Sequence, residues 1–408
     1  MLNADGRIFF ATRITRLFAY GFLAVVLSLY LIEAGLNEAQ IGALLTLTLV
    51  GDTLISLWIT TNADRIGRKR MLLAGAGLMI FAGVLFAITR NFWLLLIAAT
   101  IGVISPSGNE VGPFLAVEQA SLSQIIPGGR RTQVFAWYNL VGSFATAFGS
   151  LSGGLLAQGL HGWGLSALDS YRVIIIGYAT VGAALVGLFV SLSPGIEPPR
   201  QEKPAQAAIF GLRHSRKIVF KLSALFSLDA FAGGFVVQSL IVLWFSKRWG
   251  VEPALLGVIF FGANLLAGVS ALSAARLAAR FGLVNTMVFT HIPSNILLML
   301  VPLMPNLPLA ITLLLLRFSI SQMDVPTRQS YTMSVVAPEE RSAAAGVTGI
   351  ARTIGASLSP VLAGPLLAST ALLGLPFILS GGLKVLYDLL LYRSFRAVQP
   401  PEEGGKHA

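Results

Sequence analysis

The stretch Thr60-Thr61-Asn62-Ala63-Asp64-Arg65-Ile66-Gly67-Arg68-Lys69-Arg70-Met71-Leu72 carries the densest charge in the chain. It separates two apolar runs, residues 41–59 and 71–89. Each run is long enough to cross the roughly 30 Å of hydrocarbon in a bilayer. Backbone polar groups that leave a helix need water or protein partners, so the residues between the runs must turn sharply in water. The stretch therefore predicts a short loop between two membrane-spanning helices, and Gly67 suits its turn.

The composition is that of a membrane protein. The 408 residues are 55% hydrophobic and 12% charged, with a mean hydropathy of +0.77, which excludes an ordinary soluble protein. The net charge of +11 lies in short segments between apolar runs, so membrane topology explains it better than a nucleic-acid partner does. No cysteine is present, which excludes disulfides, thiolate metal ligands and cysteine catalysis. We expect an all-α polytopic membrane protein without a removable signal peptide.

The apolar runs predict twelve spans. We place them at residues 8–32, 41–60, 71–89, 92–124, 132–157, 172–193, 218–246, 254–276, 284–303, 307–336, 342–368 and 371–393. Most Arg and Lys residues of the connecting loops fall on one side of the membrane, which by the positive-inside rule is the cytoplasmic side. We therefore expect both termini in the cytoplasm, and a bacterial inner membrane as the location.

The order Asp-Arg-x-Gly-Arg-Lys at 64–69 resembles the loop signature of the major facilitator superfamily, the large group of twelve-helix secondary transporters. That family writes the motif as G-x-L-A-D-R-x-G-R-K-x-x-L, and Thr60 and Asn62 stand here in place of its Gly and Leu. The resemblance implies twelve transmembrane helices in two six-helix bundles related by a pseudo-two-fold axis. It also implies a conformational gate in this loop, in which Asp64 pairs with a neighbouring helix end; the gate residues are Asp64, Arg65, Gly67, Arg68 and Lys69.

The two halves of the sequence resemble each other. Gly35 and Gly67 recur as Gly250 and Gly282, at a constant offset of 215 residues. Residues 194–217, rich in Pro and charge, form the longest polar break. We therefore predict an N-terminal six-helix bundle at 1–193, a cytoplasmic linker at 194–217, a C-terminal six-helix bundle at 218–396 and a cytoplasmic tail at 397–408.

The fifth span contains an antiporter-like sequence, Ala145-Thr-Ala-Phe-Gly149-Ser150-Leu151-Ser152-Gly153-Gly154. It is similar to the superfamily's antiporter motif G-x-x-x-G-P-x-x-G-G, with Ala145 in place of the first glycine and Ser150 in place of the proline. Small residues at this spacing fit close helix packing equally well. As an antiporter signature, it would imply export by exchange.

Ionisable residues within the hydrocarbon are costly, so each is a functional candidate. The resemblance implies that the first, fourth, seventh and tenth helices line a central cavity. In the first span Arg13, Arg16 and Tyr20 share one helical face, although both arginines could instead reach the cytoplasmic headgroups. In the fourth span Asn109 and Glu110 lie among Gly and Pro residues, which predicts a broken helix and makes Glu110 the leading proton carrier.

The seventh and tenth spans carry the next candidates. Asp229 has apolar sequence neighbours, where a carboxyl group could load and release protons. Arg317, Asp324 and Arg328 share one face of the tenth span, and Asp324 and Arg328 are one turn apart, so they are either an ion pair or part of a substrate site. Asp52, in the second span, has no cation on its own helix and fits a proton role or a helix-to-helix hydrogen bond.

Four other intramembrane groups favour structural roles. Glu118 is expected to pair with a loop arginine, and Lys384 with Asp388 one turn away. His291 is expected to be a packed residue at the periphery in preference to a protonation switch. No His and carboxylate set has metal-site spacing, so no metal site is predicted.

These observations predict a secondary transporter and not an enzyme. It would move a small organic solute by alternating access, as proton-coupled efflux (proton antiport). The proton-coupling candidates are Glu110, Asp229, Asp324 and Asp52, and the substrate-cavity candidates are Arg16, Tyr20, Asn109, Arg317 and Arg328. The alternatives are uptake or facilitated diffusion of an anionic or sugar-like solute, and a lipid-handling or non-transporting protein on the same fold. We expect a monomer in a lipid bilayer, with no cofactor and no nucleic-acid partner.

Overall fold

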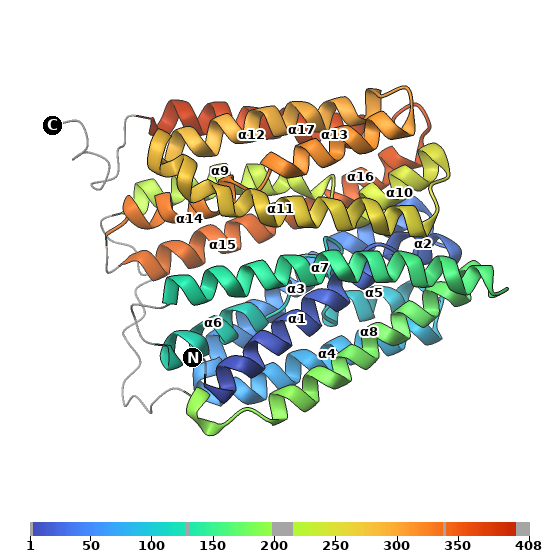
Figure 1. Ribbon diagram of the computed structural model, residues 1–408, viewed down its shortest axis with the longest axis horizontal. Coiled ribbons are helices and arrows are strands. Elements are labelled where there is room, and N and C mark those ends of the chain that lie inside the picture. Colours follow the sequence, from blue (N-terminus) through green and yellow to red (C-terminus); the bar gives the residue numbers. More distant parts are fainter. Residues whose placement is uncertain (1–2, 127–130, 198–214, 338–339, 397–408) are drawn as a thin grey trace. The chain divides into compact units, whose positions relative to one another are not determined.

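A computed structural model describes residues 3–126, 131–197, 215–337 and 340–396, and in these ranges the secondary structure is helical, without a strand (Figure 1). The predicted tail at 397–408 and most of the predicted linker at 194–217 lie outside the described residues. The chain divides into two compact units, unit 1 (Met1–Lys203 and Val237–Asn264) and unit 2 (Pro204–Val236 and Leu265–Ala408). The division into two sequential six-helix bundles stays a prediction.

Unit 1 holds the helices of the first half and one helix of the second half. They are α1 (Ala4–Ala24), α2 (Leu27–Glu33), α3 (Glu38–Ile66), α4 (Arg68–Ile88), α5 (Phe92–Ile101), α6 (Phe114–Ile125), α7 (Arg131–Gly162), α8 (Ala167–Val190), the short 3-10 helix η2 (Pro194–Ile196) and α10 (Gln238–Trp249). Within this unit α1 packs against α7 and α8, and α4 packs against α8 (Figure 1).

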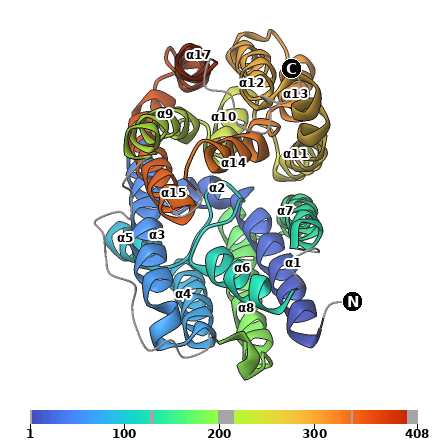
Figure 2. The same cartoon turned by 90° about the vertical axis from the view of Figure 1, so that its left-hand side faces the viewer.

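Unit 2 holds the remaining helices. They are α9 (Arg216–Gly234), α12 (Leu283–Leu300), the 3-10 helix η4 (Val301–Leu303), α13 (Leu307–Ile320), α14 (Asp324–Ser334), α15 (Arg341–Leu358), α16 (Pro360–Ala368) and α17 (Leu375–Phe395). The division between the units falls within α11 (Pro253–Phe281). In unit 2, α9 packs against α15 and α17, and α12 packs against α17 and α13 (Figure 2).

The helices match the predicted spans. Among the described residues, ten helices are long and apolar enough to cross a membrane, or eleven if the bent pair α1 and α2 is one span. The fourth predicted span corresponds to the shorter apolar helix α5, ten residues long, together with α6. This confirms an all-α, twelve-span membrane protein.

Several spans are interrupted. The first, fourth, seventh, tenth and eleventh predicted spans each consist of two helices in succession. Between α1 and α2 the chain bends by 43°. The fourth span has the longest interruption, residues 102–113, where Gly108 and Gly112 have φ angles of +69° and +79°. Glycine adopts such angles with little strain. Because residues 102–113 form no helix, the predicted break in this span is confirmed.

The internal repeat is visible in the helices. Both α3 and α11 have 29 residues, and they begin 215 residues apart (253 − 38). Gly67 ends α3 with φ +117° and Gly282 ends α11 with φ +84°. In each half a glycine with positive φ thus makes the turn into the following helix.

Candidate functional site

Each unit contains a group of charged side chains buried among its helices. We call Arg13, Arg16, Glu110, Glu118 and Tyr138 the unit 1 cluster. Arg16, on α1, is fully buried: its Nε lies 2.8 Å from Glu110 Oε1, and its two terminal nitrogens lie 2.8 and 2.7 Å from the oxygens of Glu118. One guanidinium group therefore joins α1 to two carboxylates of the fourth span. These bonds are charge-assisted and have two-point geometry, the strongest arrangement for such a pair.

Glu118 lies at the closed end of this cluster. Its side chain is fully buried, and it accepts hydrogen bonds from Tyr138 Oη on α7 and from Thr12 Oγ1, the latter at 2.8 Å. The prediction that Glu118 pairs with a loop arginine is wrong, because its cationic partner is Arg16 within the first span. Both of its oxygens thus accept hydrogen bonds from protein groups, which favours a structural role.

Glu110 lies at the more open end. It belongs to the non-helical stretch 102–113, and its side chain is 13% exposed, against 0% for Glu118. It pairs with both Arg13 and Arg16. Arg13 and Arg16 are 6% and 0% exposed, so the alternative in which they reach the lipid headgroups is wrong. Two arginines and two glutamates leave this cluster electrically balanced.

Tyr20, Asn109 and Asp52 surround the same break. Tyr20 donates a hydrogen bond to the backbone oxygen of Val111 at 3.1 Å, while Asn109 is exposed. Asp52, on α3, accepts hydrogen bonds from the Gly112 backbone and from Ser56, and in the described part of the chain it forms no ion pair. Arg16, Tyr20, Glu110 and Asp52 are therefore brought together around one non-helical segment.

We call Asp229, His291, Asp324, Arg328, Lys384 and Asp388 the unit 2 cluster. Asp229, on α9, is 4% exposed, and its two oxygens lie 2.6 Å from Lys384 Nζ and 3.1 Å from an Arg328 nitrogen. The apolar setting predicted for Asp229 is wrong, because these cations come from α17 and α14, far away in the sequence. Arg328 also lies 2.9 Å from Asp324, so of the two alternatives left open by the sequence the ion pair one turn apart is present.

His291 and Asp388 occupy one side of the unit 2 cluster. His291 Nδ1 lies 2.9 Å from Asp388 Oδ1, and Asn295 Nδ2 donates to Asp388 Oδ2 at 3.2 Å. The predicted Lys384–Asp388 pair is therefore wrong, and so is a purely packed His291. Spacing along one helix suggested the first pairing, but the helices turn Lys384 towards α9 and Asp388 towards α12.

Arg317 and Arg352 have a different environment. Both are half-buried, and the Nε of each is buried without a hydrogen-bond partner. Neither forms an ion pair among the residues described in unit 2, although both are within electrostatic reach of Asp229 and Asp324. Sequence reasoning selected Arg317 and missed Arg352, which lies in the eleventh span and which only its burial identifies.

The junction between α3 and α4, where Gly67 makes the turn, is bonded to Glu197, the residue that follows η2 in unit 1. Asp64, whose side chain is 67% exposed, pairs with Arg68 at 2.8 Å. The carboxylate of Glu197 accepts hydrogen bonds from the backbone nitrogens of Arg68 and Lys69, at 2.7 and 3.1 Å. A carboxylate at this position satisfies unpaired donors at the N-terminus of α4 and interacts favourably with its dipole. The predicted pairing of Asp64 with a neighbouring helix end stays a prediction.

The antiporter-like residues of α7 lie in close helix contacts. A Cβ at Gly149 would lie 2.0 Å from the Phe18 oxygen, and one at Gly153 would lie 2.3 Å from the Phe22 oxygen. Ser150 donates to the Gly21 oxygen at 3.3 Å, and Gly154 faces Gly257 of α11. The small residues thus let α1 approach the α7 backbone, which is the packing role that the sequence left open.

The chemistry available to these clusters is proton and ion binding. In the ranges that the structure covers, no three His, Cys, Asp or Glu residues are arranged to hold a metal ion. What each cluster contains is carboxylates joined to cations across helices. Protonation of one carboxylate, or binding of a charged solute, would therefore change which helices are joined.

Comparison with known proteins gives a family. The sequence profile described as Major Facilitator Superfamily matches residues 9–360. The uncharacterised membrane protein YJR124C of Saccharomyces cerevisiae is 30% identical over 97% of this chain and 95% of its own length. The quinolone resistance protein NorA of Staphylococcus aureus is 25% identical over 35% of each chain.

The fold agrees with that family. The crystal structure of a mutant of the nucleoside transporter NupG superimposes with a TM-score of 0.75 over 96% of this chain and all of that chain, at 14% identity. At this identity the likeness shows the fold alone. The profile match and the full-length yeast relative lead to the same conclusion: the chain is a multi-pass membrane protein that belongs to the major facilitator superfamily of transporters.

Proposed function

We propose that this protein exports a small organic solute by alternating access and takes up protons in exchange. The observation that carries the proposal is Glu110, a carboxylate within the membrane that is partly exposed and held by two arginines of the first span. Charged groups at this depth are costly and are retained where they bind or relay ions. The partial antiporter motif in α7 supports export as the direction, and the partial likeness to the quinolone resistance protein NorA supports a small organic solute.

Glu110 can couple a proton to a change of conformation. When Glu110 is ionised, Arg13 and Arg16 tie α1 to the broken fourth span. When Glu110 is protonated, Arg16 keeps Glu118 but Arg13 loses its carboxylate, so one buried positive charge is left without a partner. Breaking a buried ion pair costs about 3–5 kcal/mol. Moving a two-state equilibrium from 1:99 to 99:1 takes about 5.5 kcal/mol. The free energy lost with this ion pair on protonation is therefore comparable to the free energy that switches the two conformations.

The other candidate carboxylates differ from Glu110 in their partners. Asp52 forms no ion pair among the described residues, so it is open to a proton or to a cationic solute. In unit 2, Arg328 of α14 bonds to Asp229 of α9 and to Asp324 of its own helix. These two carboxylates are the proton-coupling candidates of unit 2. Tyr20 and Asn109 flank Glu110 and would contact solute.

The test is transport in proteoliposomes with an imposed pH gradient. A thermal-shift screen first selects a solute, since a ligand that binds the folded state raises its melting temperature. A fluorescent quinolone is the first probe. We expect wild-type protein to move the probe against its gradient, and Glu110→Gln to lose this while keeping downhill movement. Glu252→Gln, at an exposed residue after α10, is the control. Unchanged gradient-driven flux with Glu110, Asp229 and Asp324 all replaced by amides would sink the proposal.

A second function has one specific observation in its favour. Arg317 and Arg352 each place an unpartnered guanidinium Nε in a half-buried position, which suits an anionic or sugar-like solute. Arg16 and Arg328, the other arginines among the predicted substrate-cavity residues, are already bound to carboxylates. Uptake or facilitated diffusion of such a solute would continue in the presence of a protonophore, whereas proton-coupled export would stop.

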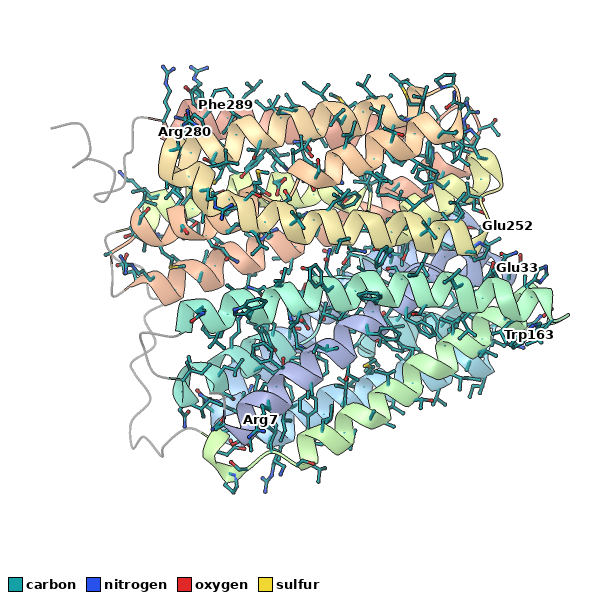
Figure 3. The ribbon with its side chains drawn as sticks, viewed as in Figure 1. Arg7, Glu33, Trp163, Glu252, Arg280 and Phe289 are labelled. Atoms are coloured by element: carbon teal, nitrogen blue, oxygen red, sulfur yellow. The ribbon has the colours of Figure 1, made fainter. Side chains whose placement is uncertain are left out.

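The proposal includes the membrane setting. Both termini are placed in the cytoplasm because the loops on that side carry most of the Arg and Lys. In Figure 3, Arg7 lies at one end of unit 1, and Glu33, Trp163 and Glu252 lie at the other. We propose a monomer as the working unit, and the bacterial inner membrane stays a prediction of the sequence.

A further inference from the structure

A buried imidazole within the unit 2 cluster lies between two carboxylates. His291, on α12, is 5% exposed. Its Nδ1 lies 2.9 Å from Asp388 Oδ1 on α17, and its Nε2 lies 4.0 Å from Asp229 Oδ1 on α9. The ring also makes an edge contact with Tyr387, with the ring centroids 6.1 Å apart. This histidine therefore joins three helices of unit 2 at one point.

The bonded groups around His291 comprise three carboxylates and two permanent cations, so with a neutral imidazole they carry one net negative charge, and Arg317 and Arg352 lie nearby without bonding to them. Among the described residues, the charged or titratable groups that surround His291 are Asp229 on α9, Arg317 on α13, Asp324 and Arg328 on α14, Arg352 on α15, and Lys384, Tyr387 and Asp388 on α17. Arg328 and Lys384 bond to Asp229, and Arg328 also bonds to Asp324. In the described chain, Asp388 has no permanent cation within ion-pair distance and is held by His291 and Asn295.

The two ring nitrogens have different tasks. The short contact at Nδ1 needs a proton between the ring and Asp388, and a neutral imidazole supplies one from Nδ1. Nε2 is then the position that gains or loses a proton, and it faces the Asp229 oxygen that Lys384 Nζ also contacts, at 2.6 Å. A proton on Nε2 gives Asp229 a third cationic neighbour and weakens its dependence on Lys384 and Arg328.

We propose that His291, oriented by Asp388, is the proton-binding site of unit 2, and that its protonation shifts Asp229 between the cations of α14 and α17. The proposal rests on the proposed function in one respect: the proton bound there is the transported one. It adds a named proton acceptor that is not a carboxylate. It also gives the α9–α12–α17 contact a role in coupling.

The first experiment measures the proton directly and needs no solute. The chain has four histidines, and replacing His161, His214 and His407 by Gln leaves His291 as the one imidazole. NMR of this variant, labelled with nitrogen-15 at histidine and reconstituted in lipid, follows protonation between about pH 5 and pH 8, the range in which histidine ordinarily titrates. We expect His291 to titrate in this range. We expect Asp388→Asn to move its midpoint by about one pH unit, the size of effect that a neighbouring charge produces.

Each outcome of this titration decides the proposal. A His291 signal that stays in one protonation state throughout overturns it, and so does a midpoint that Asp388→Asn leaves unchanged. If Asp388→Asn does not give a monodisperse preparation, Asn295→Ser replaces it, because this change removes a hydrogen bond to Asp388 and leaves both charged partners in place.

The second experiment tests whether the proton is transported. In proteoliposomes with the quinolone probe and a pH gradient, we expect His291→Gln to lose at least tenfold of the gradient-driven accumulation and to retain downhill movement. His161→Gln, at an exposed residue in the last turn of α7, is the matched control. Gradient-driven accumulation that survives in His291→Gln overturns this role for His291 but leaves the proposed function standing. Absence of gradient-driven transport by wild-type protein of every solute that the thermal-shift screen selects contradicts the proposed function, whatever the titration shows.

Discussion

At the scale of single residues, Arg16 is the most constrained charge in unit 1. It is fully buried, bonds to Glu110 and Glu118, and lies with its guanidinium carbon 4.6 Å from the centre of the Phe114 ring. The sequence placed Arg16 on the same helical face as Arg13 and Tyr20. Its partners are 94 and 102 residues away, so no spacing rule could have identified them.

Arg16→Met should strongly destabilise the protein. Glu118 would keep its hydrogen bonds from Tyr138 and Thr12 but would lose its cation, and removing one partner of a buried pair costs about 3–5 kcal/mol. Arg7→Met, at an exposed residue of the same helix, should change stability by less than about 0.5 kcal/mol. Thermal unfolding in detergent checks the order. Equal melting temperatures for the two variants would show that the cluster does not support the fold.

At the scale of elements, α7 shows how one sequence pattern can serve packing. Gly149 and Gly153 face the backbone of α1, whereas Gly159, on the same helix, has no heavy atom within 4 Å of the position of an added Cβ. The same helix thus offers glycines with and without a packing partner. That contrast separates close packing from the intrinsic cost of glycine in a helix.

Gly153→Ala should destabilise unit 1 by about 1–3 kcal/mol, because its new methyl group would lie 2.3 Å from the Phe22 backbone oxygen. Gly159→Ala should instead stabilise α7, by up to about 1 kcal/mol, since alanine is the better helix former. Thermal unfolding of the two variants is the measurement. If Gly153→Ala is as stable as Gly159→Ala, the close contact between α1 and α7 does not exist.

The junction between α3 and α4 gives a prediction in which transport changes and stability does not. Asp64→Asn should leave the melting temperature almost unchanged, because the Asp64–Arg68 pair is largely exposed on its carboxylate side and exposed pairs contribute about 0–1 kcal/mol. We expect it to change the transport rate and the balance of inward and outward forms. Asp169→Asn, in the exposed Asp169–Arg172 pair of α8, is the control. A transport rate and a conformational balance that both stay at wild-type values would remove Asp64 from the gate.

At the scale of the whole molecule, the two clusters have opposite polarity. In unit 1 the cations Arg13 and Arg16 lie on the first span and the carboxylates on the fourth. In unit 2 the carboxylate Asp229 lies on the seventh span and Arg328 on the tenth. The duplicated halves therefore both carry buried charge on their first and fourth spans, but the cations of unit 1 lie on its first span, whereas Arg328 lies on the tenth span beside Asp324.

The absence of cysteine makes the topology directly measurable. In intact cells, a membrane-impermeant maleimide should label Trp163→Cys and Glu252→Cys, which are exposed at one end of unit 1 (Figure 3). It should label Arg7→Cys and Arg280→Cys only after the membrane is opened. Labelling of Arg7→Cys in sealed cells would contradict cytoplasmic termini.

The sequence by itself determined the number of spans, the internal repeat, the turn at Gly67 and the break in the fourth span. Each depends on local chemistry: apolar length, loop charge and glycine at positive φ. It also found the Asp324–Arg328 pair, since residues four apart in a helix are neighbours.

Only the tertiary structure decided which charges meet across helices. Lys384 and Asp388 are one turn apart on α17, yet Lys384 contacts Asp229 and Asp388 contacts His291. The helices of a bundle present each residue to neighbours distant in sequence, and a buried charge takes the partner that this packing offers. The sequence could therefore name His291 but not its two carboxylate partners, because these come from α9 and α17.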